Sequence, residues 1–327
     1  DVFASLERAP ERLRVRIAAL PGVQTVETRI TAWTTVDIAG IDEPIVANLV
    51  SLPSHGEPLL NLPALQAGRA VAQGRDDEAV VLARFADARG LGLDDRIAVL
   101  LNGAKRQVRI VGLAYSPEFV YAIGPGQLMP DDKRFAVVWM DRKAIAAAYD
   151  LDGAFNNVTL ALLRETDPRA VIEQLDRLLD RYGGIGAIAR KDQISNWFLM
   201  NEFRQLRTMA TILPTIFLVA AAFLTNMVLA RLIDLERQEI ALMKAFGYSD
   251  WRIAWHYGQL AGAMAMGGVV LGWGIGALLG WYNTNVYGTI QFQFPFLFFR
   301  PGGPEFFLSA FVSIGAALLG AFWAVRR

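Results

Sequence analysis

Two long uncharged runs dominate the C-terminal half of the chain. Residues 208–230 and 253–299 contain no Asp, Glu, Lys or Arg. A helix needs about 20 apolar residues to cross roughly 30 Å of hydrocarbon, so runs of this length predict membrane spans. We expect one span within residues 195–230, a second within 253–282 and a third within 305–325.

The first of these helices is predicted to be longer than a bilayer is thick. If residues 195–230 form one helix, it measures about 54 Å at 1.5 Å per residue. Its N-terminal part should therefore stand outside the membrane as a stalk. Pro214 is expected to bend the start of the span.

The charged stretch between the first two spans is short, and its basic residues lie close to the span ends. Those residues are Arg231, Arg237, Lys244 and Arg252. Because cytoplasmic loops carry an excess of Lys and Arg near the membrane, this loop is predicted to be cytoplasmic. Apolar residues at three- and four-residue spacing predict an amphipathic helix over residues 232–247, and Gly247 suits the position just past its end.

The sequence of this loop resembles the cytoplasmic loop of the FtsX-like permease family. Residues 236–248 read ERQEIALMKAFGY, and that family has a charged pair, an E-I-A or E-I-G series, a basic residue and an A-x-G end. The resemblance implies that the helix docks on the ATPase subunit of an ABC-type machine, while an ordinary solvated connector is the alternative. The implied coupling residues are Glu236, Arg237, Glu239, Leu242, Lys244, Phe246 and Gly247.

Residues 1–192 show the patterns of a mixed domain of helices and strands. Helix-strand-strand followed by strand-helix-strand predicts an α+β, split βαβ sandwich of the ferredoxin-like kind. The expected elements are a helix over 8–20, strands over 31–38, 45–52, 157–163 and 185–190, and a helix that starts at Asp167 and Pro168.

Between the two halves, the sequence pattern of about residues 58–140 predicts an inserted, strand-rich lobe. A strand over 78–83 precedes a short helix over 84–89. Asn102 and Gly103 separate two further strands and are the strongest two-residue hairpin signal. The lobe resembles the second subdomain in the outer domains of MacB-type and lipoprotein-releasing permeases.

The resemblance implies an extracytoplasmic core domain over residues 1–192 and an α-helical membrane domain with three spans over 193–327. With the charged loop inside, the larger domain lies outside the cytoplasm of a bacterium, attached to its inner membrane. Residues 1–10 lack the apolar segment of a signal peptide, so we expect a first span, which family members have, to be missing from this sequence.

Composition removes several classes of function. Lys plus Arg equals Asp plus Glu at 32 each, so no basic surface indicates nucleic acid as a partner. The chain has no cysteine, and its histidines, His55 and His256, lie in different parts, so no metal site or Ser-His triad is predicted. A Walker loop is missing from the sequence, so ATP is expected to bind the partner subunit.

Three carboxylates, Glu118, Asp131 and Asp132, raise the question of acid-base chemistry. A catalytic pair needs perturbed environments and a defined separation, which the sequence does not provide. We therefore predict no catalytic, cofactor-binding or metal-binding residue, and a membrane subunit rather than an enzyme.

Glycines recur at every fourth position of the second predicted span. Gly268, Gly272, Gly276 and Gly280 would share one helix face, where another backbone can approach closely. We expect a helix-helix interface there, with a span of this chain or of another subunit.

Aromatic residues gather near the end of the inserted lobe. Phe119, Tyr121 and Trp139 either form a contact surface for a lipid-bearing or peptide cargo or pack the lobe against the sandwich.

The resemblance implies the permease subunit of an ABC-type export or lipoprotein-release system, which transmits ATPase-driven motion to the outer domain. An FtsX-like scaffold that activates a cell-wall hydrolase is the alternative, although a large outer domain favours export. The absence of charged residues from the middle of the spans argues against an ion path. The implied partners are an ABC ATPase, a second permease subunit, membrane lipid, a lipoprotein, peptide or drug cargo, and a periplasmic adaptor.

Overall fold

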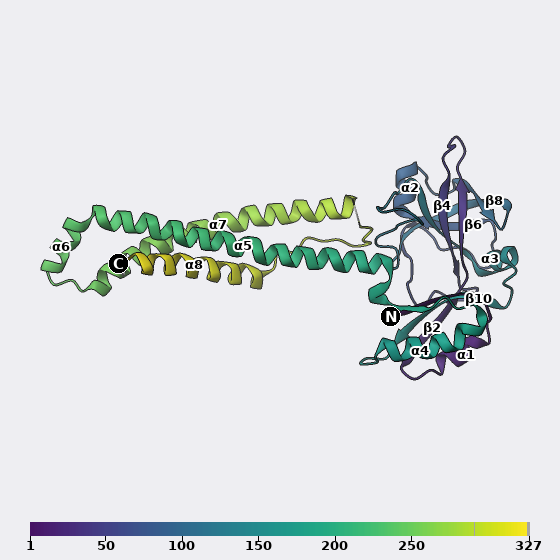
Figure 1. Ribbon diagram of the computed structural model, residues 1–327. Coiled ribbons are helices and arrows are strands. Elements are labelled where there is room, and N and C mark those ends of the chain that lie inside the picture. Colours follow the sequence, from purple (N-terminus) through teal and green to yellow (C-terminus); the bar gives the residue numbers. More distant parts are fainter. Residues whose placement is uncertain (291, 326–327) are drawn as a thin grey trace. The chain divides into compact units, whose positions relative to one another are not determined.

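The structure is a computed structural model that describes residues 1–290 and 292–325 (Figure 1). The chain divides into two compact units. The N-terminal unit comprises Asp1–Asn201 and Gly288–Phe296, and the helical unit comprises Glu202–Tyr287 and residues 297–325.

The first sheet of the N-terminal unit is ferredoxin-like. Its strands lie in the order β11-β1-β10-β2, and neighbouring strands are antiparallel. A helix follows the first strand of each half, which gives the chain order βαβ and βαβ and confirms the predicted split βαβ sandwich. The elements are β1 (Val2–Pro10), α1 (Leu13–Ala18), β2 (Val23–Arg29), β10 (Ala154–Leu162), α4 (Pro168–Leu179) and β11 (Ala187–Ala189), with single 3-10 turns at Asp180–Tyr182 and Arg190–Asp192.

Three predicted features of this sheet were wrong. The helix expected over 8–20 is only α1, because the residues before it pair with β10 as strand β1. Leu, Glu, Arg and Ala in that strand favour helix locally, and the long-range pairing overrides them. Strand β2 was missed, and the strands expected over 31–38 and 45–52 belong to the second sheet.

The second sheet closes on itself. Its strands follow the order β5-β8-β6-β9-β4-β3-β7, and β7 also pairs with β8, so the sheet forms a barrel with β5 added at β8. The hairpin at Asn102 and Gly103 is confirmed, with φ of 44° and 85°. The elements are β3 (Thr31–Asp37), β4 (Ile45–Leu52), β5 (Ala64–Gly68), β6 (Glu78–Leu82), α2 (Ala83–Arg89), β7 (Arg96–Leu101), β8 (Ala104–Tyr115), β9 (Phe135–Asp141) and α3 (Arg142–Tyr149).

Each sheet has its own core. Ile17, Phe155 and Leu175 lie in the ferredoxin-like core, whereas Phe85 and Phe135 lie in the barrel core. Because β3 and β4 pair with β7 and β9, the inserted lobe includes them, and the boundary expected near residue 58 lies too late in the chain.

The helical unit is built from long apolar helices. They are α5 (Ile194–Leu235), whose first residues belong to the N-terminal unit, α7 (Asp250–Ile290) and α8 (Gly303–Val325), with the short α6 (Arg237–Ala245) after α5. Within residues 1–290 and 292–325, three helices are long and apolar enough to cross a membrane. The predicted number of spans is thereby confirmed for the described chain.

Candidate functional site

Helix α6 is a short exposed helix between α5 and α7 (Figure 1). It begins after Glu236, where φ of −94° and ψ of 15° interrupt the long helix. The helix expected from residue 232 thus starts later, because α5 continues to Leu235. Leu242 exposes 58% of its surface and Phe246, at the end of the helix, exposes 80%. Such exposed apolar side chains on a charged helix offer a contact surface to another protein.

The end of α6 is defined by Gly247. Its φ of +88° lies in the left-handed region that favours glycine. The amide of Tyr248 donates to the Met243 carbonyl at 3.1 Å, and the amide of Gly247 donates to the Lys244 carbonyl at 3.0 Å. These bonds form a Schellman motif, which confirms the predicted helix end.

The charged residues of α6 differ in their surroundings. The Tyr257 hydroxyl donates to Glu236 Oε2 at 2.5 Å, so this carboxylate is engaged within the chain. Arg237 lies 3.5 Å from Asp234 in an exposed ion pair. Glu239 in the first turn and Lys244 in the last turn complement the helix dipole. Docking of these residues on an ATPase stays a prediction.

A second tyrosine-glutamate bond joins the other ends of the same two helices. The Tyr287 hydroxyl of α7 donates to Glu202 of α5. Glu202 and Glu236 are separated by about 51 Å of helix, and Tyr257 and Tyr287 by about 45 Å, at 1.5 Å per residue. Both separations exceed the roughly 30 Å of hydrocarbon in a bilayer. Sequence reasoning missed both pairs, because only packing of α5 against α7 brings their partners together.

Glycines of α7 line an apolar groove. A Cβ added at Gly268, Gly272 or Gly276 would meet no other atom within 4 Å, whereas at Gly280 it would lie 2.8 Å from Phe299. The groove has a volume of about 840 Å³ and is also lined by residues of α5 and α8. A helix-helix interface at Gly268, Gly272 and Gly276 stays a prediction.

A close backbone approach between helices lies at another glycine, which the sequence analysis missed. A Cβ at Gly320 of α8 would lie 2.5 Å from the carbonyl oxygen of Ala222 in α5. The Asn226 side chain donates to the Gly320 carbonyl at 3.1 Å. A glycine in the third span was the available signal, but a single glycine in an apolar run is too common to single out.

Of the aromatic residues considered for cargo contact, Trp139 and Tyr121 are buried in the N-terminal unit, and Phe119 is partly buried. Trp139 exposes 2% of its surface and meets Phe119 edge to face at a centroid distance of 6.3 Å. Tyr121 is buried and stacks on Phe198 at 4.3 Å. Burial of Trp139 and Tyr121 contradicts a cargo surface formed by these two rings, whereas a cargo contact by Phe119 stays a prediction.

The three carboxylates considered for acid-base chemistry are also engaged. Glu118 accepts two hydrogen bonds from Arg29, at 2.6 and 3.0 Å. Asp132 pairs with Arg84 at 2.9 Å, and Asp131 accepts the amides of Lys133 and Arg134. These contacts are structural.

One loop anchors both connections between the barrel and the long helices. The residues after β8 bind the start of α5, where Ser195 Oγ accepts from the Tyr121 amide at 2.8 Å. The same loop binds the segment after α7, where the Gln293 amide donates to the Val120 carbonyl at 2.7 Å. Phe292 lies 5.5 Å from the Tyr121 ring. The first residues of α5 and residues 292–293 are therefore fixed to the same side of the barrel lobe.

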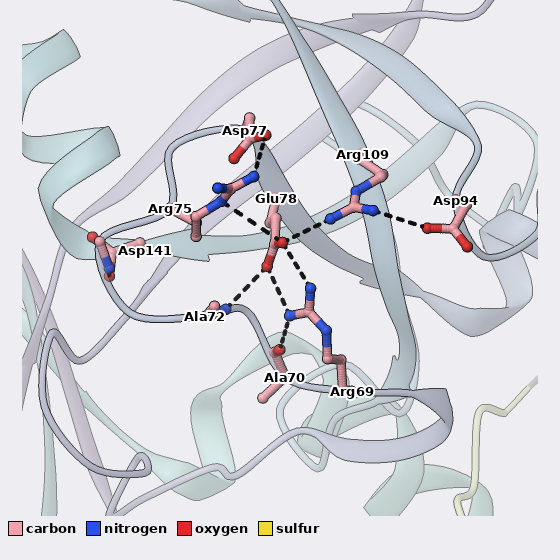
Figure 2. Close-up of polar contacts among 10 residues, drawn as sticks. Arg69, Ala70, Ala72, Arg75, Asp77, Glu78, Asp94, Arg109 and Asp141 are labelled. Atoms are coloured by element: carbon pink, nitrogen blue, oxygen red, sulfur yellow. Dashed lines mark hydrogen bonds and ion pairs between the residues drawn. The ribbon is translucent and has the colours of Figure 1, made fainter.

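A buried carboxylate holds the loop before β6 in place (Figure 2). Glu78 accepts from Arg69 at 2.7 and 2.8 Å, from Arg109 at 2.9 Å and from the Ala72 amide at 3.1 Å. The Arg69 hydrogen bond in particular lowers the pKa of Glu78 from 4.5 to about 2, although burial opposes this effect. Exposed acids such as Asp94 balance the arginines, so the cluster is an internal network rather than an anion site.

Three solved structures show a distant similarity to part of the chain. The extracellular domain of the noncanonic ABC-type transporter YknZ from Gram-positive bacteria is 11% identical, with a TM-score of 0.39, covering 58% of this chain and 100% of that one. The periplasmic region of MacB from Actinobacillus actinomycetemcomitans is 9% identical, with a TM-score of 0.36, covering 61% and 91%. A domain of a putative permease from Porphyromonas gingivalis is 13% identical, with a TM-score of 0.35, covering 57% and 88%.

The C-terminal part of the chain matches a family model. No curated protein matches the chain. Residues 211–327 match the family described as FtsX-like permease C-terminal, a range that includes α6, α7 and most of α5. Residues 211–327 are therefore similar to the C-terminal region of FtsX-like permeases, in agreement with the resemblance seen in the loop sequence.

Proposed function

We propose that this chain is the permease subunit of an ABC-type export or lipoprotein-release system. The observation that carries the proposal is α6, an exposed helix with a defined end that lies between two apolar helices of membrane-spanning length. A permease of this family implies a separate ABC ATPase as its partner, and that partner binds the ATP. In this proposal α6 is the surface that the ATPase grips.

In the proposal, displacement of α6 is transmitted to the N-terminal unit through contacts at both ends of α5 and α7. Glu236 at the start of α6 accepts the Tyr257 hydroxyl, so displacement of α6 acts on α5 and α7 together. At the other ends of these helices, Ser195 and Gln293 are bonded to the loop after β8. The barrel lobe would thus receive the pull of both helices through one loop.

The orientation in the proposal follows from the basic residues around α6. Arg231, Arg237, Lys244 and Arg252 support a cytoplasmic position of this loop. In the proposal the N-terminal unit then lies outside the cytoplasm, and the apolar helices span a bacterial inner membrane. A second permease subunit would approach at Gly268, Gly272 and Gly276, where the groove leaves room for a helix. A lipoprotein, peptide or drug is the cargo class that this arrangement would move.

Co-purification with an ABC ATPase tests the docking role. We would express the full chain with ABC ATPases of its own genome, starting with any whose coding region adjoins its own. Glu239→Lys inverts an exposed charge in the first turn of α6, and Gly247→Pro disrupts the Schellman motif. Each variant should reduce recovery of the ATPase at least about tenfold, the equivalent of 1.4 kcal/mol.

The matched control is Glu173→Lys, which makes the same charge change at an exposed position of α4. It should leave ATPase recovery unchanged. Unchanged recovery with both α6 variants would contradict the proposal. Labelling from one side of the membrane that reaches both Lys244 and an exposed residue of the N-terminal unit, such as Val15, would contradict the orientation.

A further inference from the structure

The loop between β8 and β9 carries an apolar tip. Leu128 exposes 89% of its surface and Met129 exposes 69%. Among the described residues, Leu128 is the most exposed large hydrophobic side chain. Two adjacent apolar side chains at a loop tip remain in contact with water unless lipid or another molecule covers them.

The tip is held out by ordered turns on both sides. Before it, the Gln127 amide donates to the Gly124 carbonyl at 3.2 Å, and the Gln127 side chain accepts from the Gly124 amide at 3.0 Å. After it, Asp131 Oδ1 accepts the amides of Lys133 and Arg134 at 3.0 and 3.2 Å. These bonds fix the backbone around Leu128 and Met129, so the tip is presented rather than folded back onto the barrel.

The base of the loop is linked through Arg84 to a residue in the last turn of the apolar helix α7. Asp132 pairs with Arg84 at 2.9 Å and accepts from Gln293 at 3.1 Å. Arg84 in turn donates to the carbonyl of Gly288 at 3.1 Å. Gly288 is the last residue of the candidate span Trp251–Gly288. The loop base is therefore linked to the last turn of α7, within one unit of the structure.

The apolar tip is only a few residues from the base of its loop. Leu128 is four residues from Asp132, which an extended chain covers in at most about 14 Å. Exposed aromatic side chains also lie on the two segments that connect the N-terminal unit to the apolar helices. Trp197, near the start of α5, exposes 51% of its surface, and Phe296, after α7, exposes 75%. Aromatic side chains of this kind favour the boundary between lipid and water. The exposed Lys133 beside the tip suits the phosphate of a lipid headgroup.

We propose that Leu128 and Met129 insert into the headgroup layer of the bilayer on the side of the N-terminal unit. The partner is a lipid surface, because the loop base is linked through Arg84 to the last turn of an apolar helix and the tip is apolar with a basic neighbour. The insertion would hold the barrel lobe against the membrane while α5 and α7 move. This inference rests on the membrane assignment in the proposed function but not on docking of α6.

Site-specific fluorescence tests the insertion. The chain has no cysteine, so Leu128→Cys gives one labelling site for an NBD fluorophore in the full chain. The labelled protein would be reconstituted in vesicles of phosphatidylcholine and phosphatidylglycerol, with or without lipid that carries a nitroxide near the headgroup. Insertion to the headgroup boundary should remove about half of the fluorescence at position 128 and shift its emission to the blue.

Two control positions separate the possible results. Val15→Cys on α1, 73% exposed in the N-terminal unit, should show no quenching, and Phe217→Cys in α5, 70% exposed, should be strongly quenched. Quenching at positions 128 and 217 but not 15 would support the proposal. Quenching at 217 alone would overturn it and leave the membrane assignment intact. Quenching at none of the three would overturn the membrane assignment and the insertion together.

Discussion

The two units place their large apolar side chains in opposite ways. In the N-terminal unit Phe85, Phe135 and Phe155 are fully buried. In the three candidate spans only 6%, 0% and 11% of the most apolar window is buried. The hydrophobic effect drives the first arrangement, because folding removes apolar surface from water. The second arrangement is stable only where the surrounding solvent is itself apolar, as lipid is.

The two units also differ in where they place charged groups. The N-terminal unit buries charges together with hydrogen-bond or ion-pair partners, as with Glu78 and its arginines or Arg29 and Glu118. In the helical unit, the described carboxylate-tyrosine bonds lie near the helix ends, at Glu202 and Glu236. A buried charge is tolerated where partners surround it, whereas a charge in the middle of a span would face lipid.

The largest effect should come from a core aromatic of the N-terminal unit. Trp139→Ala removes a side chain that exposes 2% of its surface and should cost about 4 kcal/mol of unfolding free energy. Urea unfolding of the full chain in detergent measures the loss of free energy. The transition is monitored by far-ultraviolet circular dichroism, because that signal does not depend on the tryptophan that is removed.

The matched comparison is Phe217→Ala in α5. This side chain is 70% exposed in the described structure, so its removal leaves no cavity. We expect a change below about 1 kcal/mol in the same measurement. Equal losses from the two substitutions would show that the apolar surface of α5 is packed against protein rather than solvated by lipid or detergent.

Acid should weaken the N-terminal unit through Glu78. Its pKa of about 2 in the folded chain lies below the ordinary 4.5, mainly because of the hydrogen bond from Arg69. The stabilisation is therefore complete above the unfolded pKa and is lost as the pH falls towards about 2. At about 1.4 kcal/mol for each pKa unit, the loss reaches at most about 3 kcal/mol.

Urea midpoints between pH 6 and pH 3 measure this effect, and Glu78→Gln isolates it. The variant has no carboxylate to protonate at this position, so its midpoint should fall less with pH than that of the unaltered chain. Parallel pH profiles for the two proteins would show that Glu78 does not stabilise the fold by its charge.

A smaller effect is expected in the helical unit from Tyr257→Phe. The substitution removes the hydroxyl that donates to Glu236 and should cost about 1.5 kcal/mol locally, because the acceptor is charged. Amide hydrogen exchange in α6 should become about tenfold faster. Tyr248→Phe, at an exposed position of the same loop, should leave exchange unchanged, and identical rates in all three proteins would exclude a role of the bond in holding α6.

Elements with strong local signals were predictable. Asn102 and Gly103 form the expected hairpin, and Asp167 caps α4 by accepting the Arg169 amide. Gly247 ends α6 at a positive φ. In each case the residue type itself favours the observed backbone, so a few neighbouring residues determine the result.

Elements that depend on distant partners were not predictable in the same way. Strand β1 has helix-favouring residues and becomes a strand by pairing with β10, more than 140 positions away. The strands β3 and β4 were recognised as strands, but their assignment to the barrel depends on pairing with β7 and β9. The sequence pattern contains no measure of which strand will lie beside which.

The sequence alone determined the number of apolar helices of span length, the strand-helix-strand order of the second half of the sandwich, and the short helix between two apolar helices, because run length, periodicity and turn residues act locally. Only the tertiary structure decided that Trp139 lies in a core, that Glu236 is bonded to Tyr257, and that Leu128 is exposed at the tip of a loop whose base is linked to α7. These features arise where segments far apart in the chain meet, and the free energy of such contacts depends on geometry that no single segment carries.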